Sequence, residues 1–430
     1  MVSIKIDKSR ISGTLWCPSS KSYTHRAIAI ASLAKGRSII NMPLISRDTI
    51  ATLSASRALG VKINQRQKSR IIIEGKHTLD TPENIINAEN SGTTIRIFAV
   101  MAALVRRGFT VLTGDASLRR RPMQPALDAL SQLGVVCYSS RMNGLAPLLI
   151  KGGGIQGGKV KIDGNVSSQF LSSLLISTTY AKSPVSIHIR GRQVSKPYIS
   201  STIATMEKFG VTIDYKKDFL EYHVQNKKYC PAEFQVPADF STAALLLAAG
   251  VLAGGNITLK GLNFSLPQAD LKILEILKDM NADVSINKEY GEVTIKGSKI
   301  IEGGSFDLTD SPDLLPVLSI LALKANSPVK ITGIAHARLK ETDRVANIAS
   351  QIKKFGATVV EDEDQLLIIA PRVIKNSSIR TFHDHRLFMA FVIASMLTEK
   401  SEVEGAESVD VSYPNFLLDL RQLGAKISFQ

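Results

Sequence analysis

Six segments of the chain share one pattern, in which a helix-like stretch stops at a glycine or an asparagine and an alternating stretch follows. The pivot residues are Gly60, Gly134, Gly210, Asn281, Gly356 and Gly424, so the steps between them are 74, 76, 71, 75 and 68 residues. The residue just past a helix end often adopts left-handed backbone angles, which glycine and asparagine tolerate best. The apolar–polar–apolar run after each pivot is typical of a half-buried strand. This spacing exceeds the ~20–50 residues of common solenoid repeats and predicts six larger structural units.

Each unit also carries a long stretch that is apolar on all sides. These stretches are residues 27–34, 95–105, 170–181, 242–254, 314–325 and 387–397. A helix that is apolar all round is buried. We therefore expect each unit to combine strands with two helices, one of them interior. The longest apolar run, 242–254, is shorter than the ~20 residues that a membrane-spanning helix needs.

Composition narrows the class of protein. The 430 residues suggest two or three domains, and the 44% hydrophobic content supports real cores. Residues 1–10 lack the apolar region of a signal peptide and are expected to form a first strand. Cys17, Cys137 and Cys230 are too far apart for a metal motif or a disulfide framework, which predicts a reducing cytoplasm.

The net charge of +15 could serve nucleic acid, a membrane surface or small anions. Aromatic residues make up only 6% of the chain, and no Arg/Lys block interleaves with them, which disfavours nucleic acid. The starts of the apolar helices are polar and often basic: residues 18–26, 88–96, 163–170, 237–242, 308–315 and 383–386. Ser, Thr, Asp and Asn there can be ordinary N-caps. Six such clusters nevertheless suggest a site for several negative charges, because helix N-termini hold anions.

Three further clusters lie outside these helix starts: "LRRRPM" (118–123), "VSKPY" (194–198) and "RLKETDR" (338–344). If the last of these is helical, Glu341 and Arg344 share a face. The alternative is an ordinary solvated ion pair.

Seven motifs, in this order along the chain, resemble those of the 5-enolpyruvylshikimate-3-phosphate synthase family. They are "SSKSYTHRAIAIASLAKG", "NSGTTIR", "RRRPM", "DGNVSSQFLSSLL", "SKPY", "LKETDR" and "HDHR". The most specific are Lys21-Ser22, Ser167-Ser168-Gln169 and residues 340–344, and the resemblance runs from about residue 10 to the end. It implies an α/β (α+β) fold of two domains, each with three βαβαββ units, and an active site in the cleft between the domains.

The resemblance also implies how the chain is divided and what it does. Residues 1–19 and 237–430 would form a discontinuous domain, and residues 20–236 an inserted domain on the shikimate 3-phosphate side. The family transfers the enolpyruvyl group of phosphoenolpyruvate to the 5-hydroxyl of shikimate 3-phosphate and releases phosphate. Both substrates are multiply anionic, so the basic residues need no nucleic acid. The expectation is a cytoplasmic enzyme without metal or organic cofactor, and a monomer.

The resemblance carries over a set of substrate-binding residues. For shikimate 3-phosphate these are Lys21, Ser22, Arg26, Ser167, Ser168, Gln169, Ser195, Tyr198, Asp313, His336 and Lys340. For phosphoenolpyruvate they are Lys21, Gly92, Arg121, Gln169, Arg344 and Arg386. The three serines at 167, 168 and 195 would hold the shikimate phosphate, and Arg26 with Ser22 its carboxylate, because a guanidinium fork suits a planar carboxylate. Gly92 would let the other phosphate approach the backbone.

Four residues are expected to be catalytic. Asp313 would be the base near the 5-hydroxyl, kept ionised in the first turn of a helix; the alternative is a capping carboxylate. Glu341 would deliver and later remove the C3 proton, with Lys21 and His385 sharing the proton traffic. A free Glu has a pKa of ~4.3 and nearby cations lower it, whereas substrate charge and loss of water raise it.

Three positions depart from the family pattern. Val411 stands where the family often has a lysine that contacts phosphoenolpyruvate. His336 stands where some members have Asn, and Ser91 replaces a common Ala. His383 and His385 could suggest a metal pair, but no carboxylate cluster supports one.

Two other functions compete with this interpretation. The sister transferase acting on UDP-N-acetylglucosamine typically carries a reactive cysteine, and Ala116 stands at the matching place here. A basic nucleic-acid-binding protein would need a continuous basic stripe, whereas the basic residues here stand at helix starts. The motifs and their order favour the shikimate enzyme.

Overall fold

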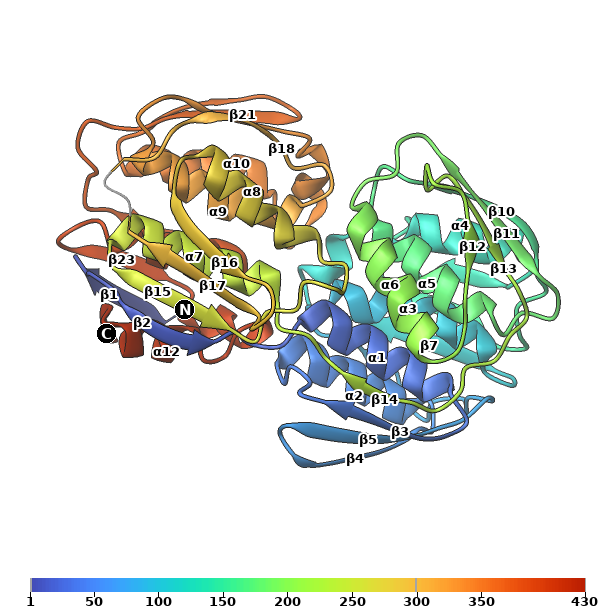
Figure 1. Cartoon of the computed structure of the whole chain (residues 1–430). Coiled ribbons are helices and arrows are strands. Elements are labelled where there is room, and N and C mark those ends of the chain that lie inside the picture. The colour runs from blue at the N-terminus through green and yellow to red at the C-terminus, as the bar shows by residue number, and fades with distance from the viewer. Residues whose placement is uncertain (1, 298–299, 430) are drawn as a thin grey trace. The chain divides into compact units, whose positions relative to one another are not determined.

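We analysed a computed structural model of the chain, in which residues 2–297 and 300–429 are described. The chain divides into two compact units: unit 1 comprises residues 1–18 and 238–430, and unit 2 comprises residues 19–237. Among the described residues, each unit holds three four-stranded sheets and six α-helices (Figure 1).

Unit 2 is a continuous stretch of chain. Its sheets, in spatial order, are β14 (Glu233–Gln235), β3 (Gly36–Asn41), β5 (Arg70–Gly75) and β4 (Lys62–Gln67); β6 (Ile86–Asn87), β7 (Phe109–Thr113), β9 (Leu148–Lys151) and β8 (Cys137–Ser139); and β10 (Gly158–Asp163), β11 (Val185–Arg190), β13 (Glu221–Val224) and β12 (Asp214–Tyr215). Its helices are α1 (Lys21–Leu33), α2 (Arg47–Ala58), α3 (Gly92–Met101), α4 (Gln124–Gln132), α5 (Ser168–Thr178) and α6 (Lys196–Lys208), with 3₁₀ turns η1 (Ala102–Leu104) and η2 (Leu118–Arg120).

Unit 1 repeats this architecture with both ends of the chain. Its sheets are β16 (Asp283–Asn287), β17 (Glu292–Lys296), β15 (Asn256–Lys260) and β2 (Gly13–Trp16); β18 (Gly304–Asp307), β19 (Val329–Thr332), β21 (Gln365–Ile369) and β20 (Thr358–Glu361); and β22 (Ser378–Ile379), β23 (Ser401–Glu404), β1 (Ser3–Asp7) and β24 (Lys426–Phe429). Its helices are α7 (Phe240–Ala253), α8 (Ile273–Asp279), α9 (Leu315–Leu321), α10 (Arg344–Lys354), α11 (His385–Ser395) and α12 (Phe416–Leu423), with 3₁₀ turns η3 (Ala269–Lys272), η4 (Pro312–Leu314), η5 (Ala322–Lys324), η6 (Ala335–Leu339) and η7 (Ala406–Val411).

All six sheets share one pairing scheme, with one parallel pair followed by two antiparallel pairs, as in β6-β7-β9-β8. The predicted six-fold repeat is therefore confirmed. The chain's first strand completes the last repeat, because Ile4 of β1 lies opposite Val403 of β23 and Phe429 of β24.

The predicted interior helices are also confirmed. In unit 1, every residue of α7 from Phe240 to Leu252 is buried, and α7, α9 and α11 pack against one another. In unit 2, the buried helix α3 packs against α1 and α5. The other helices pack one apolar side inward; in α10, Val345, Ile348 and Ile352 are buried, while Ser350 and Lys353 are exposed. Because the interior helices lack a solvent side, their starts are where polar groups can gather.

The six pivots behave as the pattern predicts. Their φ angles are +82°, +78°, +83°, +59°, +96° and +110°, all in the left-handed region that glycine and asparagine tolerate. Each pivot thus ends one helix and turns the chain into the next strand.

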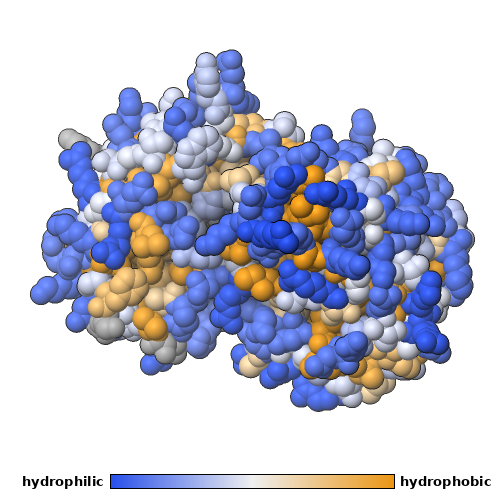
Figure 2. Space-filling model, turned by 90° about the horizontal axis from the view of Figure 1, so that it is seen from below, coloured by the Kyte–Doolittle hydropathy of each residue, from blue (hydrophilic) through white to orange (hydrophobic). Residues whose placement is uncertain are grey.

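The surface is mainly hydrophilic on the face shown in Figure 2, with smaller hydrophobic patches between polar residues. Across the described ranges, no helix combines the length and the apolar character that a membrane span requires.

Candidate functional site

Lys21 begins α1 in unit 2 and is paired with a carboxylate from the neighbouring helix. Its Nζ lies 2.7 Å from Oδ2 of Asp48, in the first turn of α2, and both side chains are largely buried. The Asp48 backbone oxygen also lies 3.5 Å from the hydroxyl of Thr94 in α3. The starts of α1, α2 and α3 therefore lie close together.

Gly92 opens α3 beside two arginines and a glutamine. A Cβ atom at Gly92 would lie 3.1 Å from Nη1 of Arg121, 3.5 Å from Nη1 of Arg96 and 3.8 Å from Oε1 of Gln169. Arg96 donates to that Gln169 oxygen at 2.7 Å and stacks over the Phe170 ring, 4.9 Å from its centre. A bare backbone at Gly92 thus keeps space open next to two guanidinium groups.

Arg26 lies inside unit 2, where it ties α1 to α6. Its Nε donates to the Thr202 hydroxyl at 2.7 Å, and its Nη atoms donate to the carbonyls of Ser22 and Tyr198 at 2.9 and 3.1 Å. Burial lowers the pKa of Arg26 to about 10. The predicted carboxylate ligand Arg26 is therefore also a structural link between α1 and α6.

The predicted phosphate serines stand at the starts of α5 and α6. Ser167 is the N-cap of α5 and accepts from the Gln169 amide at 3.2 Å, while Ser168 is the first helical residue. Ser195 precedes α6 with φ +57° and ψ +40°, a left-handed conformation that costs a non-glycine residue energy. The backbone bond from Val194 N to Gly164 O, 3.1 Å, joins the two loops. Such strain is typical of functional positions.

Arg344 in unit 1 is surrounded by three carboxylates. Its Nε lies 2.7 Å from Oδ2 of Asp384, its Nη1 lies 2.9 Å from Oδ1 of Asp313, and its Nη2 lies 2.6 Å from Oε2 of Glu341. Only 1% of the Arg344 side chain is exposed, so the Glu341–Arg344 contact is not a solvated surface pair. Burial alone would lower the pKa of Arg344, but these carboxylates raise it above its usual range.

Glu341 is not helical, so Glu341 and Arg344 do not share a helix face. Helix α10 begins only at Arg344, with Asp343 as its N-cap, and Glu341 lies in the preceding bend. The pair forms because Arg344 is the first helical residue and its side chain reaches back over that bend.

Asp313 is held by cations rather than by a helix start alone. It lies in the first turn of η4, the 3₁₀ helix that leads directly into α9, which agrees with the predicted first turn of a helix. Its Oδ2 accepts from Nη2 of Arg386 at 2.8 Å, and Lys340 Nζ is 3.9 Å from Oδ1. Burial alone would raise the pKa of Asp313, but Arg386, Lys340 and Arg344 outweigh it and hold the pKa well below its usual range.

Asp384 makes two kinds of contact at the start of α11. Its Oδ1 accepts the amide of Arg386 at 2.9 Å as an N-cap, while its Oδ2 holds Arg344. Phe382 and His383, just before it, have φ angles of +54° and +58°. Two consecutive left-handed residues that are not glycine aim this carboxylate at Arg344.

His336 and His385 are both buried. His336 lies in η6, which packs against η4, the turn of Asp313. His385 is the first residue of α11. Val411 is buried in η7, so the position where the family often has a lysine supplies no cation here. Residues 2–297 and 300–429 contain no group of three or more His, Cys, Asp or Glu side chains that could hold a metal ion.

Four charged residues of these clusters were not predicted from the sequence: Asp48, Arg96, Asp270 and Asp384. Asp384 entered only within "HDHR" and Arg96 only within "NSGTTIR". Asp270, in η3, is 2% exposed, and the hydroxyl of Ser241 in α7 donates a very short hydrogen bond to its Oδ2. Burial, and then the charge of Asp313, raise the pKa of Asp270. Nothing in "PQADLK" marks such a residue, because its environment is tertiary.

The raised pKa of Asp270 predicts a pH effect on stability. As pH rises above the ordinary aspartate range, the unfolded chain ionises first, so unit 1 loses stability until the folded carboxyl also ionises. Asp270→Asn removes this loss. The free energy of unfolding of the variant, relative to that of the unchanged chain, should therefore rise over that pH window and then level off. Urea unfolding between pH 4 and 9 measures this, with the exposed Asp279→Asn as control. If the free energy of unfolding depended on pH in the same way for Asp270→Asn and Asp279→Asn, the prediction would be wrong.

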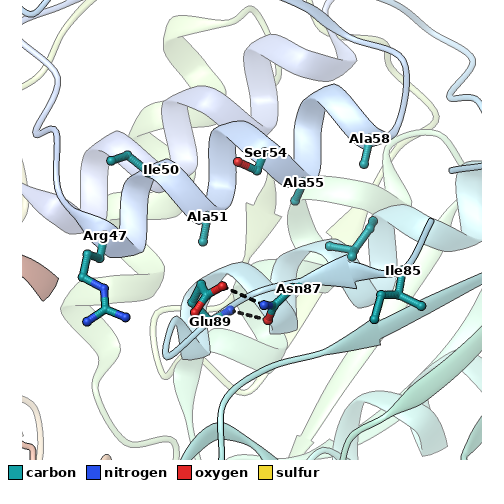
Figure 3. Close-up of a pocket in the computed structure, with 10 residues that line it drawn as sticks. Arg47, Ile50, Ala51, Ser54, Ala55, Ala58, Ile85, Asn87 and Glu89 are labelled. Carbon is teal, nitrogen blue, oxygen red and sulfur yellow. Dashed lines mark hydrogen bonds between the residues drawn. The ribbon is translucent and has the colours of Figure 1, made fainter. Parts of the chain in front are cut away.

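A separate pocket in unit 2 contains none of the predicted site residues. It has a volume of about 420 Å³ and lies between α2 and residues 85–89 (Figure 3). Its walls are largely apolar, with Ile50, Ala51 and Ala55 on the helix side. Glu89 and Asn87 are hydrogen-bonded to each other at its edge. With one arginine, Arg47, opposite a glutamate, this pocket does not suit a multiply charged anion.

The repeated fold and the buried cations at helix starts agree with what the sequence resemblance implies. It implies six βαβαββ repeats in two units, and the structure adds carboxylates paired to arginines in one unit and serines at helix starts in the other.

Comparison with known proteins identifies the family. Residues 6–420 match the family described as EPSP synthase (3-phosphoshikimate 1-carboxyvinyltransferase). The 3-phosphoshikimate 1-carboxyvinyltransferase of Nitrosopumilus maritimus (strain SCM1) is 45% identical over 423 residues, 98% of this chain and 99% of that one. The enzyme of the same name from Methanocaldococcus jannaschii is 42% identical over 421 residues, covering 97% of each chain. The solved EPSP synthase of Acinetobacter baumannii is 26% identical with a TM-score of 0.84, covering 100% of both chains.

The chain belongs to the EPSP synthase family. Enzymes of this family transfer the carboxyvinyl group of phosphoenolpyruvate to shikimate 3-phosphate, in the shikimate pathway of aromatic amino acid biosynthesis. The two alternative functions are not supported.

Proposed function

We propose that the clusters of unit 1 and unit 2 divide this reaction between them. In the proposal, unit 2 holds shikimate 3-phosphate and part of phosphoenolpyruvate, and unit 1 supplies the acid–base groups with two further arginines. The observation that carries it is the network in which Asp313 and Glu341 pair with Arg344 and Arg386. Carboxylates that exchange protons thus lie beside cations that can bind an anion.

In unit 2, Ser167, Ser168 and Ser195 would bind the shikimate phosphate. Hydroxyls and free amides at the starts of α5 and α6 are suitable donors for a phosphate. Arg26 and Ser22 would hold the carboxylate, and Gln169 and Tyr198 would contact the ring, with Lys340 and His336 of unit 1 completing the set.

For phosphoenolpyruvate, the ligands would be Lys21, Arg121, Gln169, Arg344 and Arg386, with the bare backbone of Gly92 beside them. The space that a Cβ at Gly92 would fill, 3.1 Å from Arg121, supports close approach of a phosphate. Val411 is buried and uncharged and supplies no cation. Arg96, which was not among the predicted ligands, is a further cation beside Gly92 in unit 2. No metal or organic cofactor has a role in this proposal.

The chemistry would proceed by addition and elimination. Asp313 takes the proton of the 5-hydroxyl as its oxygen attacks C2 of phosphoenolpyruvate, while Glu341 gives a proton to C3, which becomes a methyl group. Phosphate then leaves as Glu341 removes a C3 proton, and Lys21 and His385 share the transfers. Preorganised cations stabilise the negative charge of the phosphate throughout.

The role of Glu341 is testable by isotope exchange. Glu341→Gln should slow exchange of the C3 protons of phosphoenolpyruvate with solvent deuterium by about 10²-fold or more, the usual contribution of a positioned acid–base group. NMR of phosphoenolpyruvate in D2O with shikimate 3-phosphate measures this. Exchange at the unchanged rate in the variant would remove Glu341 from the proposal.

The proposal includes a monomeric cytoplasmic protein that binds neither nucleic acid nor membranes. The basic side chains in the described clusters face carboxylates or helix starts, which supports small anions as ligands.

A further inference from the structure

The outer edge of the Arg344 guanidinium is already occupied by the protein's own carboxylates. Asp384 accepts hydrogen bonds from Nε at 2.7 Å and from Nη2 at 3.3 Å, and these two nitrogens form the inner edge of the guanidinium. Asp313 and Glu341 take Nη1 and Nη2 at 2.9 and 2.6 Å. One planar carboxylate normally binds both terminal nitrogens of an arginine as a fork. Here two separate carboxylates fill the two places that one incoming carboxylate would need.

The same cluster has no excess of cations. Three cations, Lys340, Arg344 and Arg386, face three carboxylates, Asp313, Glu341 and Asp384, and the carboxyl group of Asp270 lies near enough to interact with Asp313 and Arg386. A cluster without excess positive charge has little net attraction for an anion. A ligand anion can therefore bind these arginines only if one of the protein's own carboxylates is displaced.

The internal carboxylates differ in how firmly they are held. Asp384 is fully buried and also caps α11 through the Arg386 amide, so its release would cost a helix cap as well as an ion pair. Glu341 lies in the bend before α10, and its side chain is 15% exposed. Asp313 is 14% exposed. Neither Glu341 nor Asp313 caps a helix, and Asp313 keeps its pair with Arg386 when it leaves Arg344. The two expected proton-transfer residues are thus less costly to displace from Arg344 than Asp384.

We propose that phosphoenolpyruvate enters unit 1 by carboxylate exchange. Its carboxylate takes Nη1 and Nη2 of Arg344 from Asp313 and Glu341, while Asp384 keeps the inner edge in position. The exchange frees the two carboxylates for proton transfer only when the substrate is bound. In the empty protein, both groups are held in ion pairs with Arg344. This inference rests on the proposed function and adds to it a self-inhibited resting site.

The exchange makes a specific prediction about affinity: removing an internal competitor should tighten substrate binding although it destroys turnover. Glu341→Gln is nearly isosteric and should lower the Kd for phosphoenolpyruvate by about tenfold or more, the factor associated with one charge-assisted hydrogen bond. Asp313→Asn should lower it as well, and this second variant serves if the first does not fold. Calorimetric titration with phosphoenolpyruvate alone, without acceptor, avoids turnover.

Two further variants separate occupation from simple charge repulsion. Glu341→Asp keeps the charge but is too short to hold Nη2 at its present place, so exchange predicts that it also binds more tightly. Glu361→Gln removes a carboxylate that pairs with a different arginine of unit 1, Arg338, at 2.9 Å, and should leave the Kd unchanged.

The outcomes are distinct. If the unchanged protein binds phosphoenolpyruvate and Glu341→Gln binds no better, the exchange is wrong and the proposed function stands. If Glu341→Asp behaves like the unchanged protein while Glu341→Gln binds better, repulsion accounts for the effect and the exchange is also wrong. If neither the unchanged protein nor any variant binds phosphoenolpyruvate, the proposed function itself fails.

Discussion

Asp313→Asn should reduce kcat with shikimate 3-phosphate by about 10³-fold while tightening phosphoenolpyruvate binding. Positioned acid–base groups usually contribute 10²–10⁴-fold, and Asn cannot accept the 5-hydroxyl proton. Its amide keeps the shape of the side chain, so the fold should survive. Steady-state kinetics and a phosphoenolpyruvate titration on the same preparation separate the two effects.

The low pKa of Asp313 is part of this prediction. Arg386, Lys340 and Arg344 stabilise its ionised form in the empty protein, which makes it a weak base. If substrate anions take up these arginines, the pKa of Asp313 rises and the carboxylate becomes a better base. A kcat within threefold of the unchanged protein would exclude Asp313 as the base, and a large rise in Kd would make it a binding residue instead.

Asp384→Asn should lower the free energy of unfolding by about 3 kcal/mol, since breaking a buried ion pair costs several kcal/mol. The Asn can still cap α11, so the loss reports mainly on the Arg344 pair. Because Asp384 fixes the inner edge of Arg344, the variant should also raise KM for phosphoenolpyruvate more than it lowers kcat. Urea unfolding, fitted with as many transitions as the curve shows, gives the first quantity and kinetics the second.

Asp343→Asn is a matched control for that variant. Asp343 also caps a helix, α10, and also pairs with an arginine, Arg338 at 3.0 Å, but its side chain is 42% exposed. An exposed pair contributes under about 1 kcal/mol. Equal losses for the two variants would show that the buried Asp384–Arg344 pair contributes no more to stability than an exposed ion pair.

The repeats could be predicted because their cause is local. A left-handed pivot such as Gly424 or Asn281 depends on the backbone of one residue, and a strand or an interior helix follows from the pattern beside it. The N-caps Ser167 and Asp384 were predictable for the same reason. Six copies of one local signal were enough to define the repeat.

The partners of the site residues could not be predicted in that way. Asp384 meets Arg344 across 40 positions of sequence, and Asp270 acquires its environment from Ser241 in another helix. No spacing encodes such contacts. The sequence placed Asp313 in the first turn of a helix but did not distinguish a 3₁₀ from an α-helical turn, because the proline before it is compatible with the start of either. The sequence was enough to identify most of the site residues, but only the fold shows which carboxylate pairs with which cation.

The most direct test of the account is phosphate release from phosphoenolpyruvate with two acceptors in parallel, shikimate 3-phosphate and UDP-N-acetylglucosamine. The account predicts release that depends on shikimate 3-phosphate and none above background with the other acceptor. Release with UDP-N-acetylglucosamine alone, or with neither acceptor, would contradict it.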